Sequence, residues 1–532
     1  MAVLCHFITA CEPAGRQNRS LHGLSGACFL IRRRGYFPWK MAMTALNNQS
    51  LPHLPPEIVV PAYDRSRVKP GIAHISVGNF HRAHQAVYMD RVLARPGQEG
   101  WGILGIGLME NPHEAQKATD MEAQDCLYSL TECAPDAPNV VRVIGSITEY
   151  MYAPADRVAT IARLADPAIR IVSMTVTEGG YYVDENGVFP IDHPLVAEDL
   201  KREVPHTIFG LLTEALRQRR ESGAGPFTIL SCDNLPQNGH VARAAFLGWA
   251  RARDAGLARW IEENVTFPCT MVDRITPAVH PEDVKRLDAE SGLDDRIPVF
   301  CEDFIQWVVE DKFCAGRPEL DAVGVQFTDD VQPYEAVKLH MLNASHSLLG
   351  LSGVLSGYRF VSEIMQDLHE VTLVEQYLAF DAEPLLHAPP GMALTDYGRR
   401  LLRRFRNKAI SDQLLRIASD STSKLAMFVR STAMGVIAHR RPVERIAFVV
   451  ACYAEYLRGH DDRGETYAIV EPHLTDDDKV KAASSRLEDA LDMTAFAGWD
   501  LRDSSVFVER YLALRQSIRD RGTRATLGQV IA

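Results

Sequence analysis

The sequence contains no run of about eighteen apolar residues, so no segment is long enough to cross a bilayer as a helix. It also has no excess of positive charge, because 57 Lys and Arg residues stand against 69 Asp and Glu residues and leave a net charge of −12. This balance argues against nucleic acid as a partner, since neutralising phosphates requires a basic face. The composition, 46% hydrophobic and 24% charged over 532 residues, is that of a globular protein with about two to four domains.

Cysteine is also scarce and dispersed. The ten cysteines form no Cys-x-x-Cys pair, and their density is far below that of a disulfide-rich scaffold. Structural zinc of the ribbon or finger type is therefore not expected. We expect reduced thiols in a cytoplasmic protein that holds no metal.

Residues 1–40 differ from the rest of the chain. They hold six basic residues against the single acid Glu12, a charge of +5, so residues 41–532 carry −17. The segment lacks the apolar core and the cleavage site of a secretory signal. It is predicted to be a disordered leader, either a transit peptide or translated sequence upstream of a true start at Met41 or Met43, and the second interpretation is favoured.

The next part of the chain alternates between apolar runs and helical stretches. Runs typical of buried strands lie at 71–77, 101–108, 140–144, 169–176, 227–231 and 322–327. Helical periodicity occurs between several of them, at 81–94, 154–164 and 207–220. Strands alternating with helices predict an α/β fold with a mostly parallel sheet and helices on both faces.

Beyond about residue 331 strand-like runs are scarce. Helical periodicity occurs at 337–351, 360–365, 397–410, 414–428, 442–457 and 506–519. We therefore place a domain boundary near 328–332, with an α/β domain over 66–330 and a mainly α-helical domain over 331–532.

The turn after the first strand is a candidate nucleotide site. Gly78, followed by Asn79 and Phe80, opens a helix, where backbone N–H groups can meet a pyrophosphate. The full Gly-x-Gly-x-x-Gly fingerprint is absent, and a glycine in such a turn is common without any ligand. Glu110 follows the next strand and could accept the ribose hydroxyls of an adenosine, or it could be an ordinary solvated carboxylate.

Two other segments carry amide and basic groups. Asn234 and Asn238 follow an apolar strand, where they suit either a ligand site or turn chemistry. On a regular helix Asn343 and His346 share a face, whereas Lys338 lies about 80° from His346 and about 140° from Asn343. A lysine in a dry cleft can serve as a general base beside amides that stabilise an alkoxide, although a surface lysine is the simpler interpretation of this spacing alone.

Five motifs occur together and in order. They are Gly78 to His84, Thr177 to Tyr181, Ser231 to Asn234, Met271 to Arg274, and Lys338 with Asn343 and His346. Together they resemble the polyol-specific long-chain dehydrogenases, the mannitol dehydrogenase family, over about residues 66–520. The segments 267–277 and 324–330 are most similar to its mannitol 2-dehydrogenase branch.

The resemblance implies a Rossmann-like domain followed by a helical domain, and an enzyme that interconverts mannitol and fructose with NAD and without a metal. Lys338 would be the general base, with Asn234 and Asn343 around the reacting oxygen and His346 orienting the substrate. The other implied roles are substrate binding by Asp273, Arg416 and Lys424, cofactor binding by Gly78, Asn79, Phe80 and Glu110, and a proton path through Glu178.

Two positions depart from the family pattern. Ser76 stands where many relatives have a glycine, and Leu425-Ala426 replaces an aromatic residue and a proline. The carboxylate of Glu110 favours NAD over NADP.

The expected partners are a small polyol or ketose, with neither nucleic acid nor membrane, and the chain is expected to be a monomer. The alternatives are a fructuronate or tagaturonate reductase, an arabinitol dehydrogenase, or a non-catalytic sugar- or nucleotide-sensing protein.

Overall fold

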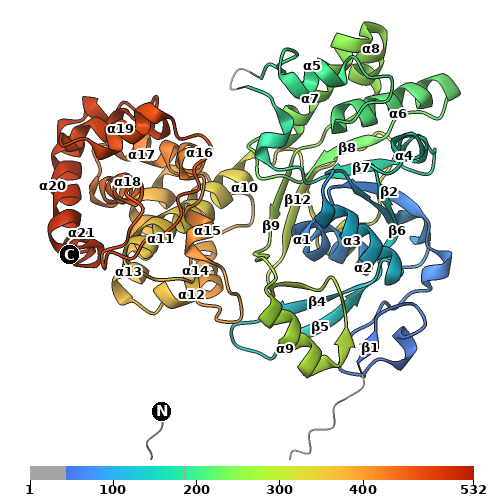
Figure 1. Cartoon of the computed structure of the whole chain (residues 1–532), viewed down its shortest axis with the longest axis horizontal. Helices are drawn as coiled ribbons and strands as arrows, with labels where there is room; N and C mark the ends of the chain where they lie inside the picture. Colours follow the sequence, from blue (N-terminus) through green and yellow to red (C-terminus); the bar gives the residue numbers. More distant parts are fainter. Residues whose placement is uncertain (1–42, 185–186) are drawn as a thin grey trace, which may run out of the picture. The chain divides into compact units, whose positions relative to one another are not determined.

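The computed structural model describes residues 43–184 and 187–532, except for the side chain of Glu178 (Figure 1). The predicted leader, residues 1–40, lies outside this described part. Residues 43–532 form one compact unit. Within the described ranges no helix combines the length and the apolarity needed to span a bilayer.

A five-stranded parallel sheet forms the centre of the N-terminal part. Its strands lie in the order β6-β3-β2-β7-β8. Their bounds are Pro70–Ile75 (β2), Gly102–Gly107 (β3), Ile147–Tyr152 (β6), Ile171–Met174 (β7) and Thr228–Ser231 (β8). The chain winds outward from β2 in one direction and then from β7 in the other, which is the doubly wound Rossmann topology predicted from the sequence.

Helices cover both faces of this sheet. Alternate residues of β2 point to opposite sides, so Ile72 packs in a core with α2 (Gln85–Leu93), whereas Ala73 packs in a core with α6 (Ile208–Ser222). The other helices of this part are α1 (Asn79–Ala83), α3 (Pro112–Ala123), α4 (Arg157–Leu164), α5 (Pro194–Asp199), α7 (Asn238–Arg253), α8 (Ala255–Asn264) and α9 (Pro281–Ser291). The strands β2, β3, β7 and β8 are buried along their whole length, which explains why their residues are mostly apolar.

Three smaller sheets flank the central one. They comprise β4 (Tyr128–Cys133) with β5 (Val140–Ile144) and β11 (Val299–Glu302), β9 (Thr270–Asp273) with β12 (Gln306–Glu310) and β13 (Gln326–Thr328), and β1 (Thr44–Ala45) with β10 (Leu293–Asp294). The run 140–144 is a strand as predicted, but it pairs antiparallel with β4 and lies outside the parallel sheet. The connection from β4 is too short for a parallel crossover, which takes about a dozen residues.

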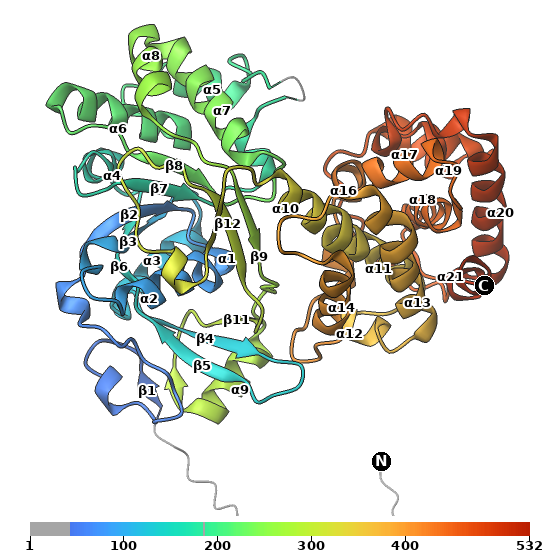
Figure 2. The same ribbon diagram turned by 180° about the vertical axis from the view of Figure 1, so that it is seen from behind.

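The C-terminal part is helical, and none of its described residues beyond Thr328 belongs to a named strand. The chain runs through α10 (Gln332–Val337), a π-helical turn η6 (Lys338–Asn343) and α11 (Ala344–Leu355). Among the helices of this part, α18 (Glu444–Tyr456), whose residues are almost all buried, packs against α11, α20 (Ser505–Arg521) and α21 (Thr523–Val530) (Figure 2). The others are α12 (Val361–Ile364), α13 (Leu368–Gln376), η7 (Tyr377–Ala382), α14 (Leu394–Phe405), α15 (Leu414–Ala418), α16 (Ser421–Phe428), α17 (Arg430–Ala438) and α19 (Asp476–Ala483).

Two predicted helices are interrupted. The stretch 414–428 divides into α15 and α16 because Asp420 adopts φ +53°, which a right-handed helix does not contain. The stretch 81–94 divides at His84, whose φ of −119° and ψ of −87° separate α1 from α2. At each break the chain changes direction, close to residues that the sequence analysis named as candidates for the site.

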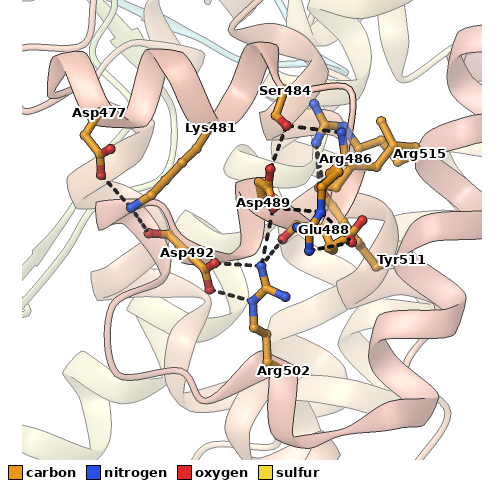
Figure 3. A network of polar contacts seen from close by, with 11 residues as sticks. Asp477, Lys481, Ser484, Arg486, Glu488, Asp489, Asp492, Arg502, Tyr511 and Arg515 are labelled. Carbon is orange, nitrogen blue, oxygen red and sulfur yellow. Dashed lines mark hydrogen bonds and ion pairs between the residues drawn. The ribbon is translucent and has the colours of Figure 1, made fainter.

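Polar contacts also fasten the last helices together. Figure 3 shows Arg502 bound to Asp492, and Arg515 near Tyr511 on α20. Arg515 donates to the carbonyl of Leu487 at 2.8 Å and to the buried carboxylate of Glu455 at 2.7 Å. This network joins α20 to α18 and to the 3-10 turn η9 (Leu487–Asp492), so it supports the fold rather than a site.

Candidate functional site

A cavity of about 360 Å³ gathers residues from both parts of the chain. It lies beyond the carboxyl ends of β8 and β9, against η6, α11, α15 and α16. Its lining includes Phe80, Asn234, Asp273, Arg274, Lys338, Asn343, His346, Asp412, Arg416, Lys424 and Phe428. The structure thus brings all four predicted catalytic residues and all three predicted substrate-binding residues to one cavity.

Lys338 and Asn234 are in direct contact although they lie 104 positions apart in the chain. Lys338 is 7% exposed, and its Nζ donates a hydrogen bond to Oδ1 of Asn234. Asn234 stands in the loop between β8 and α7. Because its oxygen faces the lysine, its Nδ2 remains a donor for another oxygen in the cavity.

The π-helical turn η6 corrects the geometry expected for a regular helix. The sequence analysis placed Lys338 about 140° from Asn343 on an α-helix. In η6 the N–H of Ala344 reaches back to the carbonyl of Leu339, five residues earlier. This i→i+5 pattern turns residues five apart toward the same face, so Lys338 and Asn343, at the two ends of η6, line the same cavity.

Asn343 and His346 present unpaired polar atoms. Within the described part of the chain, Oδ1 of Asn343 and Nε2 of His346 are buried and have no hydrogen-bond partner. The His346 ring packs on Phe405 with 4.6 Å between ring centroids. Burial lowers the pKa of His346 to about 4, so the ring is neutral and can accept or donate one hydrogen bond at each nitrogen according to its tautomer.

Asp273 ends β9 and is 3% exposed. Arg404 on α14 donates to both of its carboxylate oxygens, at 2.9 and 2.7 Å. Burial opposes ionisation, but the charges of Arg404 and then Lys338 outweigh it and lower the pKa of Asp273. The cavity therefore contains a fixed carboxylate.

Arg416 on α15 and Lys424 on α16 also line the cavity. Arg416 forms an ion pair with Asp412, and its side chain is 54% exposed. Nζ of Lys424 donates to the carbonyls of Ile417 at 2.9 Å and Ser419 at 2.6 Å, which cap the end of α15. Both residues border the cavity, and each is also engaged by its own protein neighbours.

The predicted nucleotide loop lies where the strand order of the sheet reverses, between β2 and β7. Ligands of doubly wound sheets bind at this position. Gly78 precedes α1, and a Cβ added to it would meet only the Ser76 carbonyl oxygen, at 4.0 Å, so the loop is open there. Asn79 accepts a hydrogen bond from Arg82 at 2.7 Å, and Phe80 reaches the cavity.

Ser76 explains how the loop departs from the glycine pattern. It adopts φ +67°, the left-handed region that a glycine occupies without strain. Its carbonyl accepts a hydrogen bond from Thr175 at 2.9 Å. The serine therefore keeps a backbone shape that the missing glycine would also adopt, and the open loop fits a dinucleotide.

Glu110 lies in the loop after β3 and is exposed, as a ribose-binding carboxylate would be before the cofactor binds. It also forms an ion pair of 2.9 Å with Arg157, the first residue of α4. An arginine in this place can accommodate a 2′-phosphate. The site thus holds one group that suits NAD and one that suits NADP.

The backbone of Glu178 begins the 3-10 turn η4 (Glu178–Tyr181), and its side chain lies outside the described part of the structure. This turn is joined to the Asn234 loop by Asp233, which accepts hydrogen bonds from the N–H of Thr177 at 2.9 Å and from the Tyr181 hydroxyl at 2.7 Å. The predicted proton path through Glu178 stays a prediction.

Glu335 is a candidate that the sequence analysis missed. It lies on α10 three residues before Lys338 and is 7% exposed. Burial raises its pKa to about 7, although the N–H of Gln237 and the charge of Lys338 favour its ionised form. A small cavity is lined by both Glu335 and Lys338. The i, i+3 spacing from Lys338 is the signal that could have identified it.

Comparisons with known proteins found similarity over both parts of the chain. The family model "Mannitol dehydrogenase Rossmann domain" matches residues 70–322, and "Mannitol dehydrogenase C-terminal domain" matches 330–518. A polyol:NADP oxidoreductase of Gluconobacter oxydans (strain 621H) is 48% identical over 484 residues, which cover 91% of this chain and 99% of that one.

Two solved structures share the fold, each with a TM-score of 0.84. A mannitol 2-dehydrogenase of Pseudomonas fluorescens, in a ternary complex with NAD and D-mannitol, is 44% identical and covers 92% of this chain and 99% of its own. A D-sorbitol dehydrogenase in substrate-free form is 47% identical and covers 91% of this chain and all of its own.

Proposed function

The chain belongs to the mannitol dehydrogenase family, and from that premise we propose that it interconverts a polyol and a ketose, mannitol and fructose, by hydride transfer with NAD. The observation that carries this proposal is the contact of Lys338 with Asn234 in a cavity that also contains Asn343, His346 and Asp273. Hydride transfer from a secondary alcohol needs a base, donors for a developing alkoxide and groups that position the chain. This cavity offers all three.

Lys338 is the proposed general base. Lys338 acts in its neutral form, in which Nζ accepts the proton of the reacting hydroxyl, and in the reverse direction it returns that proton. Asn234 and Asn343 donate to the oxygen as its negative charge develops, and His346 and Asp273 orient the neighbouring hydroxyls. When bound, the nicotinamide supplies the hydride acceptor or donor.

The proton must also leave the buried lysine. Glu335 offers a route, because it lines the small cavity beside Lys338 and its pKa of about 7 allows it to bind and release a proton near neutral pH. Glu178, proposed from the family resemblance, is the alternative. A Glu335→Gln variant that retains the normal pH dependence of turnover would favour Glu178.

NAD is the proposed cofactor because Glu110 can accept hydrogen bonds from the adenosine ribose and would repel a 2′-phosphate. The ion pair with Arg157 and the similarity to a polyol:NADP oxidoreductase support NADP as the second candidate. Comparing kcat/KM for the two cofactors decides between them, and a higher value with NADP would reject NAD as the preferred one.

The substrate class follows from the charges around the cavity. Asp273 is an ionised carboxylate there, and Asp412 compensates Arg416, which favours a neutral polyol over a uronate. We would measure NAD reduction with mannitol and arabinitol, and NADH oxidation with fructose and fructuronate. Turnover with fructuronate alone would identify the protein as a uronate reductase instead. Binding of these compounds without turnover of any of them would favour a sensing protein.

Lys338→Ala tests the assignment of the base. We expect kcat to fall by about 100-fold or more, since general base catalysis contributes about 10²–10⁴-fold. The variant should retain its affinity for NADH, which a fluorescence titration would show. Lys479→Ala, which removes an exposed lysine on α19, is the matched control and should behave like the wild type. Turnover near the wild-type value in Lys338→Ala would contradict the proposal.

A further inference from the structure

Arg404 is a buried arginine that lies behind the cavity and does not line it. Its guanidinium makes two bidentate contacts. Nη1 and Nη2 donate to Asp273 at 2.9 and 2.7 Å, and Nε and Nη2 donate to Glu302 at 2.8 and 2.7 Å. The planar fork of arginine matches a carboxylate in this manner, and lysine cannot reproduce it.

The two carboxylates belong to the N-terminal part, and the arginine belongs to the helical part. Asp273 ends β9 and Glu302 ends β11, whereas Arg404 lies on α14. Glu302 also accepts a hydrogen bond from the N–H of Ile275, so its carboxylate braces the segment that follows Asp273. Arg404 therefore determines where the Asp273 carboxylate stands relative to the helical side of the cavity.

The next residue of α14 acts on the other wall of the cavity. Phe405 packs on the His346 ring, with 4.6 Å between centroids. One helix end thus holds an acid from β9 and a histidine from α11, both of which border the cavity. A substrate chain that bridges these two side chains would depend on α14 for the distance between them.

Stability by itself is a weak explanation for this arrangement. Replacing a buried ion network with apolar residues is often neutral or stabilising, because desolvation of the charges offsets their attraction. The network sets two buried carboxyl groups against one guanidinium, beside the buried Lys338. Stability does not require this buried ion network, whereas a role in holding Asp273 in place explains it.

We propose that Arg404 is a positioning residue for the reaction, which holds the Asp273 carboxylate in the orientation that meets the hydroxyls of a neutral polyol. This inference rests on the proposed function. It predicts that loss of the bidentate contact weakens the use of the polyol far more than the binding of the cofactor.

Arg404→Lys is the first test, because it keeps a positive charge between the two acids while it loses the fork. We expect kcat/KM for the polyol to fall by about 10- to 100-fold, mostly through KM, since a displacement of about 1 Å can cost that much. The dissociation constant for NADH should change less than about twofold. Arg403→Met, on the exposed side of the same helix, is the matched control and should retain wild-type values.

Glu302→Gln separates positioning from a general structural role. It disturbs the same buried network but leaves the Asp273–Arg404 contact in place, and the amide oxygen of Gln can still accept from the N–H of Ile275, so kcat/KM should stay close to that of the wild type. A purely structural role predicts equal losses in Glu302→Gln and Arg404→Lys. If Arg404→Lys does not fold, the double variant Arg404→Gln/Glu302→Gln keeps the net charge of the network and should show the same rise in KM.

A double-mutant cycle with Asp273→Asn identifies the route of the effect. If Arg404 acts through Asp273, Arg404→Lys should change kcat/KM by less than about twofold in the Asp273→Asn background. Independent, additive losses would overturn the inference, as would a normal KM in Arg404→Lys. A wild-type enzyme inactive on every polyol and ketose would instead reject the proposed function, and this inference with it.

Discussion

Glu370 is an example of an ionisable side chain that lies in the protein interior, where water does not solvate it. Glu370 on α13 is 0% exposed, and Ser352 donates to its Oε2 at 2.8 Å. Its other carboxylate oxygen, Oε1, is buried and has no hydrogen-bond partner among the described residues. Burial therefore raises the pKa of Glu370 to about 8, far from the ordinary value of 4.5.

This shift predicts how stability depends on pH. Between about pH 4.5 and 8 the folded protein keeps the Glu370 proton and the unfolded chain releases it, so the contribution of Glu370 to stability falls as the pH rises. Glu370→Gln should remove the loss. The free energy of unfolding of the variant minus that of the wild type should therefore increase by about 1 kcal/mol for each pH unit that the pH rises across that range.

Urea unfolding of both proteins at pH 5, 6, 7 and 8 would measure the difference. Glu375→Gln, an exposed position on the same helix, is the control and should show no such trend. A gain of the same size at pH 5 and at pH 8 would contradict the assignment of the trend to Glu370.

Among the secondary-structure elements, η6 has the most direct consequence for the site. An i→i+5 turn keeps Lys338 and Asn343 on one face although they are five positions apart. Deletion of His340 would leave them four apart, which an ordinary α-helical turn also places on one face. Insertion of an alanine after His340 would leave them six apart and out of phase.

We therefore expect the deletion to retain far more turnover than the insertion, and the insertion to lower kcat by about 100-fold or more. Steady-state assays of the two variants would measure this, with NADH titration as a check on folding. An alanine inserted after Gly391, in an exposed loop, is the control for an added residue. Equal activity of the deletion and the insertion would show that the phase of η6 does not matter.

At the scale of the whole molecule, the described cysteines are dispersed through the cores and unpaired. Six of the seven are buried, and only Cys314 is half-buried. Burial raises the pKa of Cys126 to about 12 and that of Cys133 to about 11, which makes their thiols poorly reactive.

A chain that starts at Met41 should therefore react with a thiol reagent at one site when folded and at all seven sites when unfolded. Absorbance of the released product counts the thiols, and Cys314→Ser should abolish the fast reaction. The melting temperature should be the same with and without reductant. Two or more fast thiols, or a melting temperature that depends on reductant, would show that the folded molecule exposes or pairs other cysteines.

The assembly of the site also belongs to this scale. Asn234 and Asp273 come from loops and strand ends of the N-terminal part, and Lys338, Asn343 and His346 come from one helical run of the C-terminal part. No segment of the chain contains the whole constellation. The two parts must therefore fold against each other before the cavity can act on a substrate.

The amino-acid sequence by itself determined the class of the fold, the helical character of the second part, and the seven catalytic and substrate-binding candidates that line the cavity. These features follow from local periodicity, from turns at strand ends and from ordered motifs, all of which act within a few neighbouring residues. The interruption at Asp420 and the antiparallel pairing of β5 were missed, because a left-handed residue and a sheet partner leave little trace in an apolar pattern.

Only the tertiary structure decided how the site is held. The direction of Lys338 around the helix axis, relative to Asn343, depends on the π-helical turn η6, which a projection of a regular α-helix cannot show. The contact of Arg404 with Asp273 joins residues 131 positions apart, and the burial of Glu335 depends on the surrounding core. Such contacts and pKa shifts arise from desolvation and charge in three dimensions, which spacing along the chain does not encode.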